Sequence, residues 1–170
     1  LMKFVQYATV ACALVTVAAC GTDSSGTQND QKCDAESTFE QIQQQIFEAQ
    51  GCTASACHGD FMQGGLDLRP ESAYANLINV EASSGNYVRV FPGEQDLSVL
   101  YQKVAAKTEG FELSALPSPI GGGTMPTGPG ALSDADLGLL RVWIRGGAPE
   151  TGIVEGSEEF ASCKLEGEIA

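Results

Sequence analysis

The chain has 170 residues, of which 43% are hydrophobic, and it carries 22 acidic against 9 basic side chains, for a formal net charge of −13. This apolar content is enough for one hydrophobic core once an N-terminal leader and a polar stretch are set aside. A chain this acidic is not expected to bind nucleic acid or an anionic lipid surface.

Residues 1–19 have the pattern of an export signal. Lys3 precedes an apolar run, Phe4 to Ala19, that is short for a membrane-spanning helix. The run ends in small residues directly before Cys20, an arrangement similar to the bacterial lipobox, so Cys20 is expected to become the lipidated first residue of the mature protein. The alternative is an ordinary signal peptide cleaved near this point. Both predict export.

Residues 20–36 are expected to form a flexible tether, because they are polar and rich in Gly, Ser, Asp and Gln. A lipid on Cys20 would hold the following domain near a membrane, in the periplasm or at the cell surface. An aspartate directly after the lipidated cysteine would favour the inner membrane. Gly21 stands there instead and favours the outer one.

The most informative stretch is Gly51–Gly59, which holds Cys52, Cys57 and the only histidine of the chain, His58. Covalent haem attachment needs two cysteines whose thiolates add to the porphyrin vinyl groups, followed directly by a histidine that ligates the iron. The common spacing has two residues between the cysteines, whereas four stand here. The same residues also suit copper or zinc, and the cysteines alone could form a disulfide. This stretch by itself leaves haem, metal and disulfide open.

Apolar spacing predicts a helical domain over residues 37–149. A capping box at Ser37–Glu40 starts a helix of about 13 residues that Gly51 ends, which delivers the chain into Cys52. Three more helices are expected: near residues 71–78, over 94–107 with Asp96 or Ser98 as cap, and from a capping box at Ser133–Asp136 to Gly146–Gly147.

Residues 109–132 show no periodic pattern and are rich in proline and glycine, as functional or disordered loops are. Met125 lies in this stretch, directly before Pro126. A thioether on a loop that can fold over a porphyrin is a natural distal iron ligand, and glycines permit a close approach. A lone methionine is usually packing material. Met62 is only four residues from His58 and is too close in sequence to reach the opposite haem face.

Four side chains with polar ends are candidates for contacts to haem propionates. Trp143 and Tyr101 can donate a hydrogen bond through the indole N–H and the phenol O–H, although both are equally compatible with an ordinary core. Arg69 and Arg89 can pair with a carboxylate, but surface arginines are more common.

The order of these elements resembles the class I single-haem cytochrome c family, and more closely the cytochrome c-like domains of bacterial exported lipoproteins. The resemblance covers roughly residues 37–149 and implies an all-α, class I cytochrome c-like fold, with three to five helices around one covalently bound haem and long irregular loops. Beyond the Cys–His stretch, the matching segments are Gly64-Gly65-Leu66-Asp67-Leu68, Pro92 to Leu100, Met125-Pro126, Leu132 to Leu137 and Trp143 to Ala148.

By this resemblance Cys52 and Cys57 attach one haem c, His58 is the proximal iron ligand and Met125 the distal one. Such a protein is an electron carrier and not an enzyme. Its partners would be redox proteins, together with the membrane through the lipid anchor, and not nucleic acid; its oligomeric state is left open. Two alternatives remain: a copper-binding lipoprotein using Cys52, Cys57 and His58, and a non-redox surface lipoprotein stapled by a Cys52–Cys57 disulfide.

The other cysteines fit this assignment. Cys12 leaves with the signal and Cys20 is lipidated. If the two cysteines of the motif hold haem, Cys33 and Cys163 remain, and the resembled fold brings the flanks of the domain together, so a disulfide between them is expected in an oxidising compartment. It would clamp residues 150–170, an acidic tail without readable chemistry. Without haem, the four cysteines of the mature chain could pair in three ways.

Overall fold

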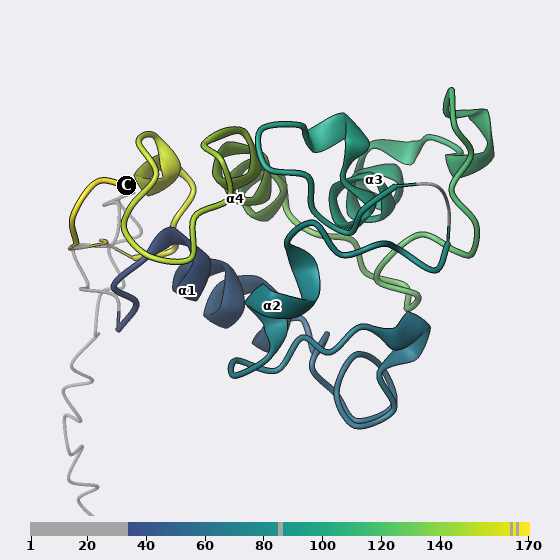
Figure 1. Ribbon diagram of the computed structural model, residues 1–170, viewed down its shortest axis with the longest axis horizontal. Coiled ribbons are helices and arrows are strands. Elements are labelled where there is room, and N and C mark those ends of the chain that lie inside the picture. The colour runs from purple at the N-terminus through teal and green to yellow at the C-terminus, as the bar shows by residue number, and fades with distance from the viewer. Residues whose placement is uncertain (1–33, 85–86, 164, 166) are drawn as a thin grey trace, which may run out of the picture.

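The structure is a computed structural model that describes residues 34–84, 87–163, 165 and 167–170 (Figure 1). In this part, the chain is a small, mostly helical domain with four α-helices, no sheet and many irregular loops. The predicted signal, the lipidation site Cys20 and most of the tether lie outside the described residues. None of the helices in the described part is long and apolar enough to cross a membrane.

Helix α1 (Thr38–Ile42) starts at the predicted cap and leads toward the Cys–His stretch. The Ser37 hydroxyl accepts the Glu40 N–H at 3.1 Å, while the Glu40 carboxylate accepts the N–H of Glu36 at 2.6 Å. The helix continues as a π-helical turn, Gln43–Glu48. Gly51 then adopts a φ of 71°, a left-handed conformation that favours glycine and lets the chain turn into Cys52.

Helices α2 (Ala73–Leu77) and α3 (Val99–Ala105) follow, and α3 continues as a π-helical turn, Ala106–Gly110. Both are shorter than the sequence predicts. Helix α3 begins after position 94 because the Ser98 hydroxyl accepts the Phe91 N–H and donates to the Glu94 carbonyl. Ser98 therefore closes the preceding turn and does not cap the helix through its side chain.

Helix α4 (Asp134–Arg145) has the predicted capping box, which is confirmed in both directions. The Ser133 hydroxyl accepts the Asp136 N–H at 3.0 Å, and the Asp136 carboxylate accepts the Ser133 N–H at 3.4 Å. Short 3₁₀ turns complete the helical elements at Gln63–Gly65, Gln95–Leu97, Leu113–Ala115 and Ser157–Glu159.

One main core joins the helices. α1 packs against α4, and α4 against α3. The Phe39 ring of α1 lies 5.1 Å from the Tyr74 ring of α2 and 5.2 Å from the Trp143 ring of α4, measured between centroids. Isolated backbone bridges join Ile78 to Val90 and Val88 to Ser98, and the second of them places Val88 beside the start of α3.

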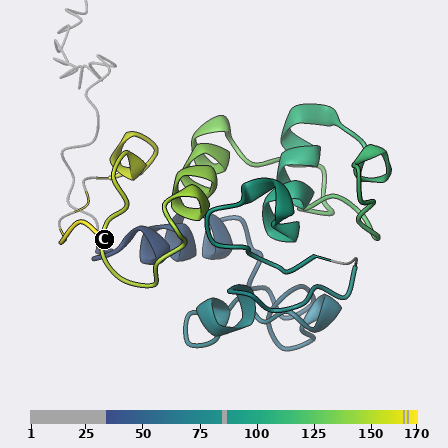
Figure 2. The ribbon, with the colours of Figure 1, turned by 45° about the horizontal axis from the view of Figure 1, so that its top comes forward.

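Residues 150–170 pack on the helical domain in their described part, and Figures 1 and 2 show this yellow segment beside α1 and α4. The Gly152 carbonyl accepts the Thr38 N–H at 3.0 Å, and the Thr38 hydroxyl accepts the Val154 N–H at 2.9 Å. Ile153 and Leu165 form a second, smaller core with Ala35. We refer to residues 150–163 as the C-terminal strap.

Candidate functional site

The predicted ligand residues Cys52, Cys57 and His58 lie in one hydrogen-bonded turn. The Cys52 carbonyl accepts the His58 N–H at 3.0 Å, which closes the residues between the cysteines into a loop. Within it the Ala54 carbonyl accepts the Cys57 N–H at 2.8 Å and the Gly59 N–H at 3.2 Å. The four residues of the unusual spacing are thus taken up by a closed loop whose tip, from Ala54 to residue 56, is exposed.

The turn is fixed to the rest of the domain through its backbone. The Gln43 amide, which is buried, donates to the Leu68 carbonyl at 2.9 Å, and the Leu68 N–H donates to the His58 carbonyl at 2.8 Å. The π-helical turn after α1 is therefore coupled to His58 through two hydrogen bonds in series.

A charged network holds the loop tip. The Arg69 guanidinium lies 2.7 Å from the Asp67 carboxylate and 3.3 Å from that of Asp60, which in turn accepts the Ser55 hydroxyl at 2.9 Å. Arg69 also holds the pKa of Asp67 at about 2, chiefly through these side-chain hydrogen bonds. The guanidinium is thus engaged with carboxylates of its own chain.

Burial sets the protonation states in the turn. It lowers the pKa of His58; the carbonyls of Leu66 and Gln63 oppose this shift, but Nδ1 remains a buried atom without a hydrogen-bond partner. Burial, with a smaller effect of the nearby Cys57, raises the pKa of the Cys52 thiol to about 11. At neutral pH the turn therefore presents a neutral imidazole and, at Cys52, a protonated thiol that is a poor nucleophile.

Met125 lies on the loop before α4, and its side chain packs against the main core, as that of Cys52 does. The Met125 N–H donates to the Lys103 carbonyl on α3 at 3.0 Å. The charges of Arg89 and Lys103 contribute to the lowered pKa of His58 less than burial does. In the described residues no hydrogen bond joins Met125 to the Cys–His turn.

The residues present fit a covalently held haem by their chemistry. Cys52 and Cys57 are free thiols at the two ends of one hydrogen-bonded loop. Nδ1 of His58 is buried and has no hydrogen-bond partner, so this ring nitrogen is not engaged by the fold. A neutral imidazole and a thioether are donors that suit haem iron.

Other predicted candidates have structural roles. The Trp143 indole N–H donates to the Pro149 carbonyl at 2.8 Å, inside the core, and the Tyr101 hydroxyl accepts from the Arg141 guanidinium at 2.8 Å. The Trp143 N–H is therefore not available to a propionate, whereas the Tyr101 contact uses the hydroxyl oxygen as an acceptor and does not use its proton. Cys163 is disulfide-bonded, while Cys33, its predicted partner, lies outside the described residues.

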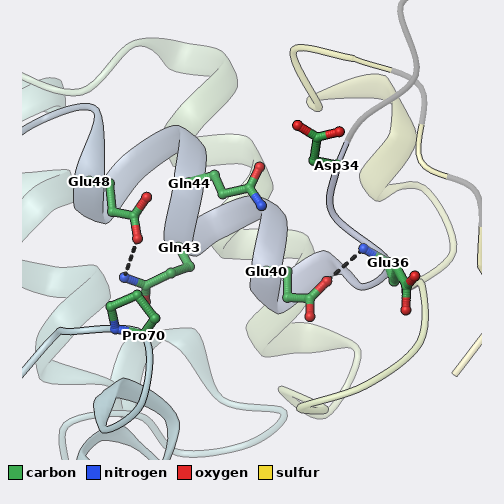
Figure 3. Close-up of a pocket in the computed structure, with 7 residues that line it drawn as sticks. All are labelled: Asp34, Glu36, Glu40, Gln43, Gln44, Glu48 and Pro70. Carbon is green, nitrogen blue, oxygen red and sulfur yellow. Dashed lines mark hydrogen bonds between the residues drawn. The ribbon is translucent and has the colours of Figure 1, made fainter.

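Figure 3 shows an acidic cavity beside α1 that contains none of the predicted ligands. Its carboxylates are partly engaged, since Glu40 accepts the Glu36 N–H and Glu48 accepts from the Gln43 amide at 3.5 Å. Nowhere in the described part of the chain do three His, Cys, Asp or Glu side chains converge to hold a metal ion.

Sequence reasoning did not find Gln43 and Lys103, the two residues that fix the ligand-bearing segments. Their partners are backbone carbonyls, which leave no residue pattern in the sequence. Comparisons with protein-family models, with curated proteins and with solved structures find no match for this chain.

Proposed function

We propose that this protein is an exported, lipid-anchored c-type cytochrome with a class I cytochrome c-like fold, which carries electrons through one covalently attached haem c. The observation that carries the proposal is the closed turn that holds two free thiols, the second of them directly before a half-buried imidazole with an unpartnered Nδ1. The mostly helical domain and the separate methionine loop are consistent with it.

Each residue has a defined role in this proposal. Cys52 and Cys57 form the thioether links, His58 is the proximal ligand and Met125 the distal one. A haem bound here would supply the one-electron couple between ferrous and ferric iron. Nitrogen and thioether ligands would favour the reduced form, and with His58 and Met125 both holding the iron the protein would act on redox partner proteins and not as an enzyme.

The protein chain would fix the position of the ligand residues and exclude water from part of the site. The series of hydrogen bonds from Gln43 through Leu68 fixes the position of His58 before any ligand binds. The main core, against which Cys52 and Met125 pack, keeps water away from one side of the site. A rigid, partly dry site changes little between two oxidation states, which is what rapid electron transfer needs.

The test is a pyridine haemochrome spectrum of the full chain made together with cytochrome c maturation proteins, after acid–acetone extraction. Retained colour with a c-type α-band is expected, and it should be lost in a Cys52→Ala, Cys57→Ala variant while Cys163→Ser, a matched loss of a cysteine outside the turn, keeps it. A colourless wild-type product beside a control cytochrome that matures normally would refute the proposal. The copper or disulfide alternatives would then lead.

The lipid anchor has its own test. Labelled palmitate should appear in the wild-type protein and not in a Cys20→Ser variant, and the labelled protein should fractionate with the outer membrane. Label that persists in Cys20→Ser would contradict lipidation at this residue and would leave the haem proposal untouched.

A further inference from the structure

Lys103 makes three hydrogen bonds to the segment that ends in Met125. Its ammonium donates to the carbonyls of Gly121 at 2.7 Å and Gly123 at 3.0 Å, and its own carbonyl accepts the Met125 N–H at 3.0 Å. One residue of α3 therefore holds both ends of the segment 121–125. Bonds from a charged donor are roughly twice as strong as neutral ones.

This segment depends on outside contacts for its shape. Gly121, Gly122 and Gly123 have the largest backbone freedom of any residue type, so ordering them is entropically expensive. The one other backbone hydrogen bond to this run within the described residues is from the Gly121 N–H to the Ser84 carbonyl, at 2.6 Å. Without the ammonium of Lys103, the backbone of Gly122 and Gly123 is no longer held in one conformation.

Arg89 makes similar contacts in the segment that follows the Cys–His turn, where its guanidinium donates to the carbonyls of Gly65 at 2.9 Å and of Asn76 at 2.8 Å. Two cations thus hold two glycine-containing segments, one after His58 and the other before Met125.

We infer that Lys103 is a positioning residue that holds the 121–125 segment so that Met125 can ligate the haem iron; this inference rests on the proposed function. Lys103 itself touches neither the iron nor an electron-transfer partner. Its function is to restrict the glycine run before the ligand arrives, which makes methionine ligation less costly in entropy.

The test compares three variants of the full chain. Lys103→Met removes the ammonium at similar length, and Lys103→Arg keeps a charged donor. Lys107→Met is the matched control, because Lys107 lies one turn further along, is similarly half-buried and makes no hydrogen bond or ion pair with the described residues. Two readouts are taken: amide hydrogen exchange of residues 121–125, and the sulfur-to-iron charge-transfer band of the haem-loaded protein.

In Lys103→Met, exchange in the segment should speed up by about tenfold, the effect expected for losing one to two net hydrogen bonds, and the charge-transfer band should weaken. Lys103→Arg should restore part of both, and Lys107→Met should change neither. Unchanged exchange in Lys103→Met would overturn the inference, as would faster exchange with an intact band. If the wild-type chain takes up no haem, the proposed function fails and the inferred role fails with it, although the exchange data still show whether Lys103 orders the segment.

Discussion

At the scale of single residues, the Cys–His turn depends on Gly59, which is buried directly after the predicted iron ligand. A Cβ atom at this position would overlap the Thr53 carbonyl oxygen and press on the Ala54 carbonyl at 3.1 Å. Both are backbone groups of the loop between the cysteines, so they cannot move aside without opening the loop.

Gly59→Ala is therefore expected to lower the free energy of unfolding by about 2 kcal/mol and to reduce haem incorporation. Gly130→Ala is the matched control, because a Cβ atom there meets nothing within 4 Å and its φ is not left-handed. Urea unfolding of the variants measures the difference. Equal stabilities for the two variants would show that the loop does not need a glycine at position 59.

A second prediction at this scale concerns Asp67, whose pKa Arg69 holds at about 2. Because the folded protein favours the ionised carboxylate, this contribution to stability is complete above the ordinary pKa near 3.8 and is lost as the pH falls toward 2. Asp67→Asn keeps a hydrogen-bond acceptor but has no charge to lose.

The wild-type protein should thus be more stable than Asp67→Asn at pH 5, and this difference should shrink steadily between pH 4 and pH 2. Urea unfolding of both proteins at several pH values across this range measures it. A difference that stays constant with pH would mean that the Arg69 contact does not depend on the Asp67 charge.

At the scale of the elements, the sequence predicted helix starts that depend on residues within one turn, but not a helix start that depends on a contact further along the chain. The caps at Ser37 and Ser133 are found where the sequence places them, because a cap needs only residues within one turn. The start of α3 was predicted too early. The Ser98 hydroxyl bonds to Phe91, seven residues away, and nothing in the local pattern indicates that choice.

Trp143 illustrates the same limit. Its sequence context left two roles open, a haem contact and a core residue, and the structure buries it completely, with its ring against the Phe39 ring of α1. The indole N–H donates to the Pro149 carbonyl, which lies beyond the helix. A side chain whose polar end is already satisfied belongs to the scaffold.

Trp143→Phe should therefore cost about 2–3 kcal/mol of stability, through lost volume and an unpaired carbonyl, and leave the haem spectrum unchanged. Tyr101→Phe removes one hydroxyl that accepts from the half-exposed Arg141, and should cost about 1 kcal/mol or less. Chemical unfolding and an absorption spectrum of each variant give both quantities. A shifted haem spectrum in Trp143→Phe would show that Trp143 contacts the haem.

At the scale of the whole molecule, the sequence predicted a mostly helical domain and one cluster of ligands, but not what holds the parts together. The sequence of the strap indicates only an acidic segment with no functional motif, yet its residues Ile153 and Val154 are buried in the structure. The cation at Lys103 binds carbonyls from a loop 18 to 20 residues away in sequence. Such contacts depend on the folded course of the chain, which spacing and composition do not encode locally.

The start of α1 holds the C-terminal strap through the hydroxyl of Thr38. Thr38 is fully buried in α1; its hydroxyl accepts the Val154 N–H and lies 2.9 Å from the Ser157 hydroxyl.

Thr38→Val keeps the shape of the side chain but leaves both of these strap groups unpaired in the interior, so the free energy of unfolding should fall by about 2–3 kcal/mol. Residues 151–163 should also become open to protease under native conditions. Thr127→Val, at an exposed loop position, should change neither. If Thr38→Val resists protease as the wild type does, the strap is held by its apolar contacts and the disulfide of Cys163, and the start of α1 is not its anchor.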